Sequence, residues 1–167
     1  MYLTTERIVM SGFRPTMSIR IGNRVVTPLI RIGLPMGPMA LLTVAGRKSG
    51  LPRTTPIAVL IDDTGWRVAA PYGVVDWVKN LRAAGRAVVS RRGRTTAVDA
   101  EELSAVEAAP VLRESIRDAG PITRRVIGPY FKAGPEDPLT DWIVEAGQHP
   151  VFLLTPIDGV DASRRAR

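Results

Sequence analysis

The 167-residue sequence has no cysteine and only one histidine, His149. This composition excludes disulfide scaffolds, thiolate nucleophiles, iron–sulfur clusters and zinc sites built from histidine and cysteine. A hydrolase that pairs a serine with a histidine would have to use His149. We therefore predict that the protein holds no metal and that its chemistry needs neither a thiol nor a set of imidazoles.

Long hydrophobic runs are also missing. No stretch approaches the roughly 20 apolar residues that span a bilayer, and the N-terminal region lacks an apolar run followed by a small-residue cleavage site. Hydrophobic residues still make up 45% of the chain and charged residues 23%, a composition too apolar for a disordered chain. We expect a globular, cytoplasmic protein.

Acidic residues are scarce in the first third of the chain. Residues 1–60 carry eight basic residues and one acidic residue, Glu6, whereas residues 61–167 carry fifteen of each, so the whole net charge of +7 arises in the first third. Part of it is a tight group formed by Arg47, Lys48 and Arg53. Such a local excess fits an anionic partner, and the alternative is a solvated basic surface.

The remaining basic residues of this third lie along an N-terminal arm, residues 1–34. Residues 16–34 have a helical pattern in which Arg20, Arg24 and Arg31 recur on one side, and Pro28 is expected to kink or split the helix. A basic amphipathic helix either packs on its own domain or lies on an anionic membrane surface. The arm therefore predicts either a cover for the domain or a peripheral contact with the inner face of the cell membrane.

Short apolar segments and turns follow the arm. We predict strands at residues 39–45, 53–61, 66–70, 87–91, 94–100 and 151–155. We predict helices at residues 76–84, 104–118, 121–125 and 139–147. Asp76 is the expected N-cap of the first helix and Gly85 its end, while Ser104 and Glu107 form a capping box. This order favours an α+β domain, an antiparallel sheet or small barrel over residues 35–160, with residues 161–167 as a frayed tail.

The residues from Gly46 to Arg53 form a basic loop between two predicted strands. Glycines let a backbone turn tightly and approach a ligand, and Arg47, Lys48 and Arg53 supply donors that match phosphate oxygens. The spacing is not that of a Walker loop, and no G-x-G-x-x-G occurs, so ATP and ordinary dinucleotide binding have no motif. The loop predicts an anion cradle, although a basic turn in water has the same composition.

The stretch Leu41 to Pro56 (LLTVAGRKSGLPRTTP) resembles the nitroreductase family of deazaflavin-dependent oxidoreductases. That family is part of the split β-barrel flavin and deazaflavin reductase superfamily. The resemblance extends to the strand 66–70, to Asp76-Trp77-Val78-Lys79-Asn80-Leu81 and to the closing strand after His149, and so covers roughly residues 35–156.

This resemblance implies a split antiparallel β-barrel of six to seven strands with an N-terminal amphipathic helix and flanking helices. It also implies binding of reduced coenzyme F-420, a deazaflavin with an anionic phosphate and polyglutamate tail. The family's contacts to the cofactor phosphate would fall here on Arg47, Lys48, Ser49 and Arg53. We also assign Ala70 and Trp77 to cofactor binding, where Trp77 could line the planar ring or instead belong to the core. FMN is the rival cofactor.

The function implied is transfer of a hydride from the deazaflavin to a small acceptor, namely a quinone, a nitroaromatic or an activated C=C bond. The cofactor then carries the difficult chemistry and the protein positions it. Family members occur as monomers and homodimers. The link 71–75 is shorter than in many members of the family, which affects the backbone contacts expected for the deazaflavin ring.

Two tyrosines are the candidates for contact with the acceptor. Tyr72 follows the strand 66–70, and Tyr130 lies in the Gly128-Pro129 interruption between helices. Either phenol could polarise an acceptor oxygen or protonate the reduced product, and the alternative is that both pack with a wet hydroxyl.

Other polar and aromatic residues have a structural interpretation. Trp142 is predicted to be core, and Trp66 could line a ring or belong to the core. We expect Asn80 to tie its helix to a neighbouring backbone and His149 to be a structural hydrogen-bonding group.

Two other functional classes remain open at this point. A split-barrel protein could bind a flavin, a haem or other tetrapyrrole, or a fatty acid without catalysis, using the same basic cradle. A small basic barrel could also bind nucleic acid, but that function favours aromatic residues interleaved with basic ones, and aromatics are only 5% of this chain. We predict no nucleic-acid partner.

Overall fold

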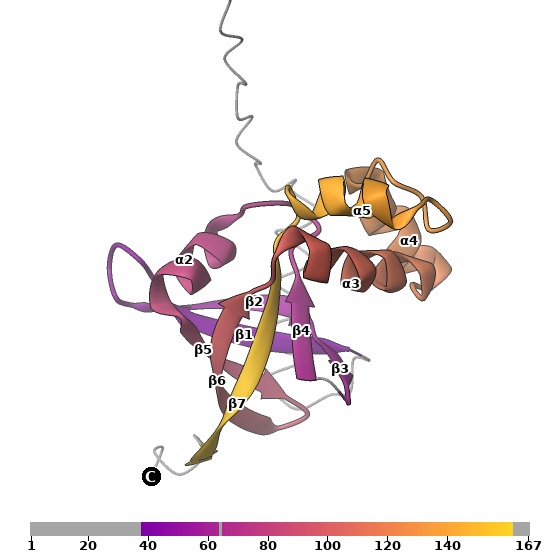
Figure 1. Cartoon of the computed structure of the whole chain (residues 1–167). Helices are drawn as coiled ribbons and strands as arrows, with labels where there is room; N and C mark the ends of the chain where they lie inside the picture. Colours follow the sequence, from indigo (N-terminus) through magenta and orange to yellow (C-terminus); the bar gives the residue numbers. More distant parts are fainter. Residues whose placement is uncertain (1–37, 64, 162–167) are drawn as a thin grey trace, which may run out of the picture.

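The computed structural model describes residues 38–63 and 65–161 (Figure 1). The strands are β1 (Met39–Ala45), β2 (Pro52–Ala58), β3 (Leu60–Asp62), β4 (Gly65–Ala69), β5 (Arg86–Arg91), β6 (Arg94–Glu102) and β7 (Val151–Asp161). The helices are α2 (Asp76–Ala84), α3 (Ala105–Arg117), α4 (Pro121–Ile127), the 3-10 helix η1 (Gly128–Tyr130) and α5 (Leu139–Ala146). The predicted helix at 16–34 lies outside the described residues.

All seven strands belong to one sheet, in the order β2-β1-β5-β6-β7-β4-β3, and every neighbouring pair is antiparallel. The two edge strands, β2 and β3, follow one another in the chain with only Val59 between them. The sheet therefore coils until its two edges adjoin at Val59, whose N–H donates to Pro38 O at 2.9 Å. Among the described residues no ladder closes the sheet, and the prediction of a split antiparallel barrel of six to seven strands is confirmed with seven.

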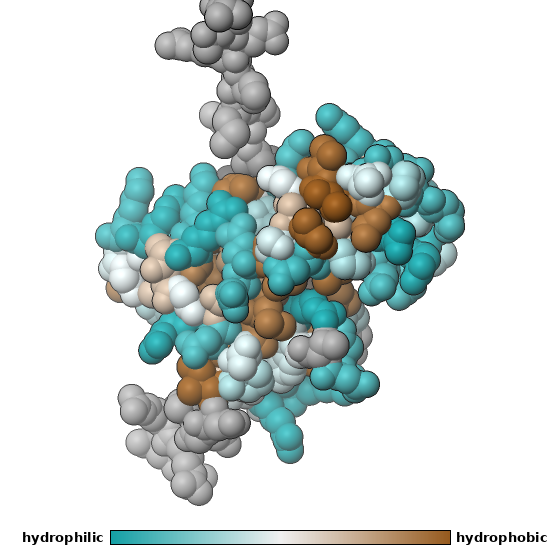
Figure 2. All heavy atoms as spheres, viewed as in Figure 1, coloured by the Kyte–Doolittle hydropathy of each residue, from teal (hydrophilic) through white to brown (hydrophobic). Residues whose placement is uncertain are grey.

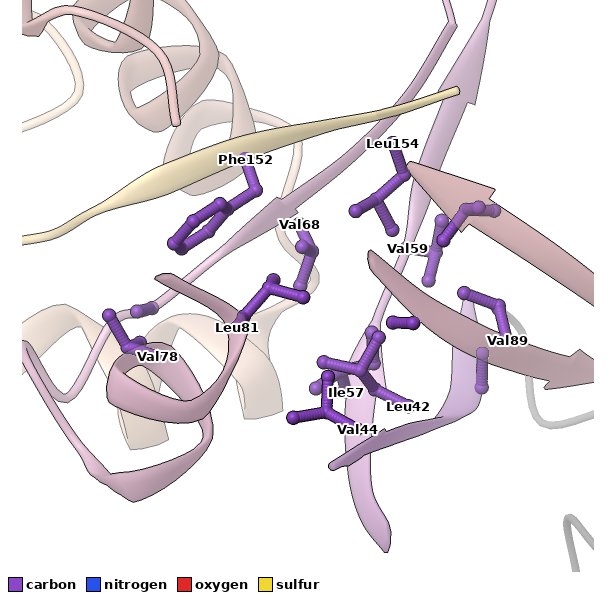
Figure 3. Close-up of a cluster of buried hydrophobic side chains, with 14 residues drawn as sticks. Leu42, Val44, Ile57, Val59, Val68, Val78, Leu81, Val89, Phe152 and Leu154 are labelled. Carbon is purple, nitrogen blue, oxygen red and sulfur yellow. The ribbon is translucent and has the colours of Figure 1, made fainter. Parts of the chain in front are cut away.

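The interior of the coiled sheet is one hydrophobic cluster (Figure 3). Alternate residues of β1, such as Leu42 and Val44, point into it, as the period of a strand requires. Helix α2 covers one opening and adds Val78 and Leu81, which lie near Phe152 in Figure 3. Each fully buried side chain of this size contributes about 1.5–3 kcal/mol, so α2 is an integral part of the barrel core.

A second cluster lies among the helices that pack together at one end of the sheet (Figure 1). Trp142 of α5 is fully buried there, as predicted, and its indole N–H donates to Gly134 O at 3.1 Å. The outer surface of this layer keeps several exposed apolar side chains, which Figure 2 shows as brown patches among polar ones. They are Val106, Ile122, Val126, Leu139 and Val144.

The local predictions hold with four differences. The segment predicted as one strand from 53 to 61 is divided into β2 and β3, because the chain bends at Val59 to reach the other edge of the sheet. The last strand runs on to Asp161, into the predicted tail, because it pairs along β6 as far as Thr96. Third, the Gly128-Pro129 interruption is itself ordered as the 3-10 helix η1.

The fourth difference concerns the start of α2. Asp76 is the first helical residue and not the N-cap; that position is Val75, and no side chain caps the helix there. Gly85 ends the helix with φ 64°, and the capping box of Ser104 and Glu107 is present, both as predicted. No helix in the described part of the chain is both long and apolar enough to cross a bilayer.

Candidate functional site

The loop between β1 and β2 is a tight turn that depends on two glycines. Gly46 N–H donates to Leu51 O at 2.8 Å, and Gly50 N–H donates to Gly46 O at 2.7 Å. A Cβ on Gly46 would lie 3.0 Å from Ser49 Oγ and 3.2 Å from Leu51 O, and Gly50 has φ 67°, in the left-handed region. These bonds and steric limits restrain the turn, and they fix the backbone positions from which its basic side chains extend.

Arg47 ties this loop to α2. Its backbone N–H and its Nη1 both donate to Asn80 Oδ1, at 3.2 and 2.9 Å, and its Nη2 pairs with Asp76 Oδ1 at 3.1 Å. The Asn80 side chain is buried, so a single amide oxygen on the helix holds both the loop backbone and its first guanidinium. The prediction that Asn80 ties its helix to a neighbouring backbone is confirmed, and Asp76 serves as the ion-pair partner of Arg47.

Lys48 and Ser49 on the anchored loop, and Arg53 at the start of β2, remain directed to solvent. All three are exposed, and neither Lys48 nor Arg53 has an ion-pair partner within residues 38–63 and 65–161. Ser49 Oγ accepts from Leu51 N–H at 3.4 Å. Uncompensated cations beside a hydroxyl on a fixed turn suit phosphate and carboxylate oxygens.

The two candidate tyrosines, 58 residues apart in the chain, meet in space. The rings of Tyr72 and Tyr130 are 4.8 Å apart between centroids, with an interplanar angle of 81°, an edge-to-face contact. Burial, and after it the neighbouring Tyr130, raise the pKa of the Tyr72 phenol above its ordinary value. Tyr72 is therefore a neutral hydrogen-bond donor throughout the physiological pH range.

A short segment connects the tyrosine pair to Asp76, the residue that contacts Arg47 of the basic loop. Tyr72 lies in the link between β4 and α2, which crosses the end of the sheet toward α2 in Figure 1. Four Cα–Cα steps separate it from Asp76, which contacts Arg47, so the Cα atoms of Tyr72 and Asp76 are at most about 15 Å apart. The loop and the tyrosines thus flank the start of α2 and together form the candidate site.

The other two residues assigned to cofactor binding lie deeper. Ala70 is buried, and its N–H donates to Pro150 O at 2.9 Å. Trp77 is half-buried on α2 and packs against the barrel core, with its ring 6.0 Å from that of Phe152. Trp66 also packs against this core from β4.

Glu145 and His149 form a buried pair that was not predicted. His149 Nε2 is 3.3 Å from Glu145 Oε2, and both side chains are less than a tenth exposed. The structural role predicted for His149 thus involves an acidic partner that was not identified. The sequence contained one indication of this pair. Glu145 and His149 are four residues apart at the end of a predicted helix, a spacing that places two side chains on one helical face.

A sequence model of the F420H2-dependent quinone reductase family matches residues 17–125 of this chain, F420H2 being the reduced form of coenzyme F-420. The match covers the basic loop, Tyr72 and all of α2. The chain belongs to this family. Family membership makes the protein an oxidoreductase that uses coenzyme F-420, and a quinone is the acceptor that the family name gives.

Solved structures resemble this chain more distantly. The F-420-H2 dependent reductase FDR-A is 19% identical with a TM-score of 0.38, and the comparison covers 70% of this chain and 93% of that one. Another F-420 reductase is 13% identical with a TM-score of 0.44, covering 77% and 93%. The heme storage protein HutZ of Vibrio cholerae is 12% identical with a TM-score of 0.49, covering 79% and 90%. None of the curated proteins matches the chain.

Proposed function

We propose that this family member transfers a hydride from reduced coenzyme F-420 to a quinone across the start of α2. In this proposal the loop from Gly46 to Arg53 binds the anionic tail of the coenzyme, and Tyr72 and Tyr130 face the acceptor. The observation that supports it most is the joining of a fixed basic loop to a pair of half-buried phenols through one short segment, residues 72–76.

The residues of the loop fit the coenzyme that the family uses. Lys48 and Arg53 offer charged donors without a competing carboxylate in the described part of the chain, and Ser49 adds a hydroxyl. Arg47 is engaged with Asn80 and carries further N–H donors, so we propose that it both orients the loop and contacts the tail. Trp77, partly exposed at the first turn of α2, and the backbone near Ala70 would border the ring.

The chain's own residues then act mainly on the acceptor. Coenzyme F-420 supplies the hydride when bound. A quinone that accepts a hydride becomes an oxyanion and needs one proton to give the hydroquinone. The Tyr72 and Tyr130 hydroxyls can donate hydrogen bonds to the acceptor oxygen, stabilise the charge that develops there and deliver this proton, which solvent then replaces.

The experiment separates coenzyme binding from turnover. Reduced coenzyme F-420 is titrated into the protein without acceptor, and its oxidation is then followed by absorbance with menadione. We expect saturable binding and oxidation that requires both protein and quinone. Binding without oxidation by any acceptor would contradict the proposal and support the alternative of a non-catalytic split-barrel binding protein for a flavin, a tetrapyrrole or a fatty acid. Parallel titration with FMN tests the rival cofactor.

The same hydride chemistry would serve two other acceptor classes, nitroaromatics and activated C=C bonds. Both are electrophiles whose reduction also ends with a proton transfer, so the tyrosine pair would act on them in the same way. Comparison of kcat/KM for menadione, a nitroaromatic and an enone in one assay ranks the three classes. We expect the quinone to have the highest value.

We further propose that the protein is cytoplasmic and that residues 16–34 contact an anionic membrane surface peripherally. The stripe of Arg20, Arg24 and Arg31 in the sequence motivates this proposal. Flotation with liposomes should depend on anionic lipid and decrease with added salt. Equal recovery with neutral and anionic liposomes would instead favour packing of the arm on the protein.

A further inference from the structure

Glu145 and His149 form a buried pair within the helical layer. Each of these ionisable side chains would be solvated at a lower free energy in water than in a buried position. Their side chains are 8% and 9% exposed, and the carboxylate and the imidazole approach to 3.3 Å. Asn80 is the one other buried polar side chain in the described residues, and it anchors the basic loop. Burying two ionisable groups is costly unless each satisfies specific partners, so the partners of this pair indicate its purpose.

Both members of the pair hold the segment that follows Tyr130. The backbone N–H of Lys132 donates to Glu145 Oε1 at 3.0 Å, while Oε2 of the same carboxylate faces His149. The imidazole packs against the ring of Phe131 at 4.4 Å between centroids. The two residues directly after Tyr130 are therefore fixed, one through its backbone and one through its ring.

The turn after α5, which contains His149, also supports the link that carries Tyr72. Ala70 N–H donates to Pro150 O at 2.9 Å. A Cβ on Gly73, which has φ 74°, would lie 3.3 Å from Gln148 O, so the link approaches this turn closely. The turn and the end of α5 thus contact both tyrosine-bearing segments.

We propose that Glu145 and His149 are positioning residues for the reaction: they hold Tyr130 against Tyr72 and thereby fix the phenol that acts on the acceptor. This inference rests on the proposed function, in which the Tyr130 hydroxyl faces the acceptor. The pair itself contacts neither the acceptor nor the coenzyme. Its loss should lower kcat and leave coenzyme affinity unchanged, because the basic loop is anchored separately by Asn80.

The first test compares two substitutions of one residue. Glu145→Met keeps the length of the side chain but leaves Lys132 N–H without its acceptor, whereas Glu145→Gln keeps an oxygen that can accept this bond. We expect kcat with menadione to fall about tenfold or more in Glu145→Met, as for a displaced reacting group, and to recover to within about threefold in Glu145→Gln. The dissociation constant of reduced coenzyme F-420 should stay at the wild-type value in both.

A matched control separates positioning from loss of stability. Val111→Ala removes buried volume from α3 in the same helical core and deletes neither the Lys132 hydrogen bond nor the Phe131–His149 ring contact. It should lower the melting temperature and leave kcat unchanged below that temperature. A fall in kcat in Val111→Ala equal to that in Glu145→Met would overturn the inference. Should Glu145→Met not fold, His149→Leu, which removes the contact to Phe131 and keeps the Lys132 bond, carries the same expectation.

The second test is a double-mutant cycle with Tyr130→Phe, which deletes only the hydroxyl. If the pair acts through this hydroxyl, Glu145→Met should cause little further loss of kcat in the Tyr130→Phe background. A loss by the same factor in both backgrounds would refute positioning and leave the proposed function intact. Wild-type turnover of Tyr130→Phe would instead show that the proposed role of the hydroxyl is wrong, and the inference would fail with it.

Discussion

The two halves of the candidate site differ in how exposed their side chains are and in which contacts hold them in place. The basic loop presents exposed charges on a turn that one buried amide, Asn80, fixes to α2. The tyrosine half presents half-buried rings that touch each other, and Glu145 and His149 contact the two residues that follow Tyr130. Exposed charges without an ion-pair partner can exchange water for an anion with little rearrangement, whereas in the proposed function the phenols act on a bound acceptor from a drier contact.

This difference separates the measurements that each half should affect. Changes in the loop should appear in coenzyme affinity and in its dependence on salt, because the charges there are screened by ions. Changes in the tyrosine half should appear in kcat, because the hydroxyls are needed only once the acceptor gains charge. The substitutions below test this separation, from the largest expected effect to the smallest.

Tyr130→Phe should have the largest effect. The ring and its contact with Tyr72 remain, and only the hydroxyl is removed. If proton delivery limits the rate, kcat should fall by roughly 10²-fold with little change in coenzyme affinity. Steady-state kinetics with menadione measure the first quantity, and titration of reduced coenzyme F-420 measures the second.

Tyr72→Phe is the companion variant, which removes the other phenol hydroxyl of the pair. We rank it below Tyr130→Phe, because the shortened link that carries Tyr72 departs from the usual pattern of the family. Wild-type turnover in both phenylalanine variants would leave a solvent-derived proton as the surviving mechanism and would remove the catalytic role of this half of the site.

Lys48→Ala and Arg53→Ala should each weaken coenzyme binding about tenfold, because one charge-assisted hydrogen bond contributes about 1.5–3 kcal/mol. The fold should remain intact, as both side chains are exposed. Arg94→Ala, which removes an exposed cation at the start of β6, is the matched control for net charge. An equal loss of affinity in Arg94→Ala would mean that the overall field of the protein, and not a cradle, attracts the coenzyme.

Asn80→Ala should act on the loop without removing any charge. The substitution leaves the partly buried N–H of Arg47 without its acceptor, which costs about 0.5–1.5 kcal/mol of unfolding free energy. We expect coenzyme affinity to fall several-fold as the loop loses its anchor, with kcat at saturating coenzyme unchanged. Asn80→Asp, which restores an oxygen acceptor, should recover affinity, and its failure to do so would argue against the anchor.

The smallest effect concerns pH. Because the pKa of Tyr72 is raised in the folded protein, first by burial and then by Tyr130, the folded state holds this proton more tightly than the unfolded state. The stability linked to Tyr72 is therefore fully present below the ordinary tyrosine pKa and is lost as pH rises through the raised value. Denaturant unfolding at increasing alkaline pH should show a smaller decline in Tyr72→Phe than in wild type. An identical decline in Tyr72→Phe and wild type would mean that solvent reaches the Tyr72 phenol in the folded protein.

Much of the fold follows from local sequence. The bounds of β1, the short connection between the strands 87–91 and 94–100, the capping box at Ser104 and the end of α2 at Gly85 were all predicted, because each depends on neighbouring residues. The start of α2 was misassigned because Asp76 suits an N-cap by type, and its partner Arg47 comes from a distant loop. The division of the strand at 53–61 also escaped prediction, because the bend at Val59 is imposed by the coiling of the whole sheet.

The candidate site likewise has features that the local sequence predicts and contacts that exist only in the folded protein. The sequence by itself determined the basic loop, since its glycines and cations are contiguous and their chemistry can be recognised without a fold. It also singled out Tyr72 and Tyr130, but only as separate residues at breaks in the chain. Only the tertiary structure decided that these rings touch, that Asn80 fixes the loop, and that Glu145 and His149 contact the segment after Tyr130. The physical reason is that these contacts join segments far apart in the chain, and a contact of that kind exists only once the sheet has coiled and the helices have packed against its end.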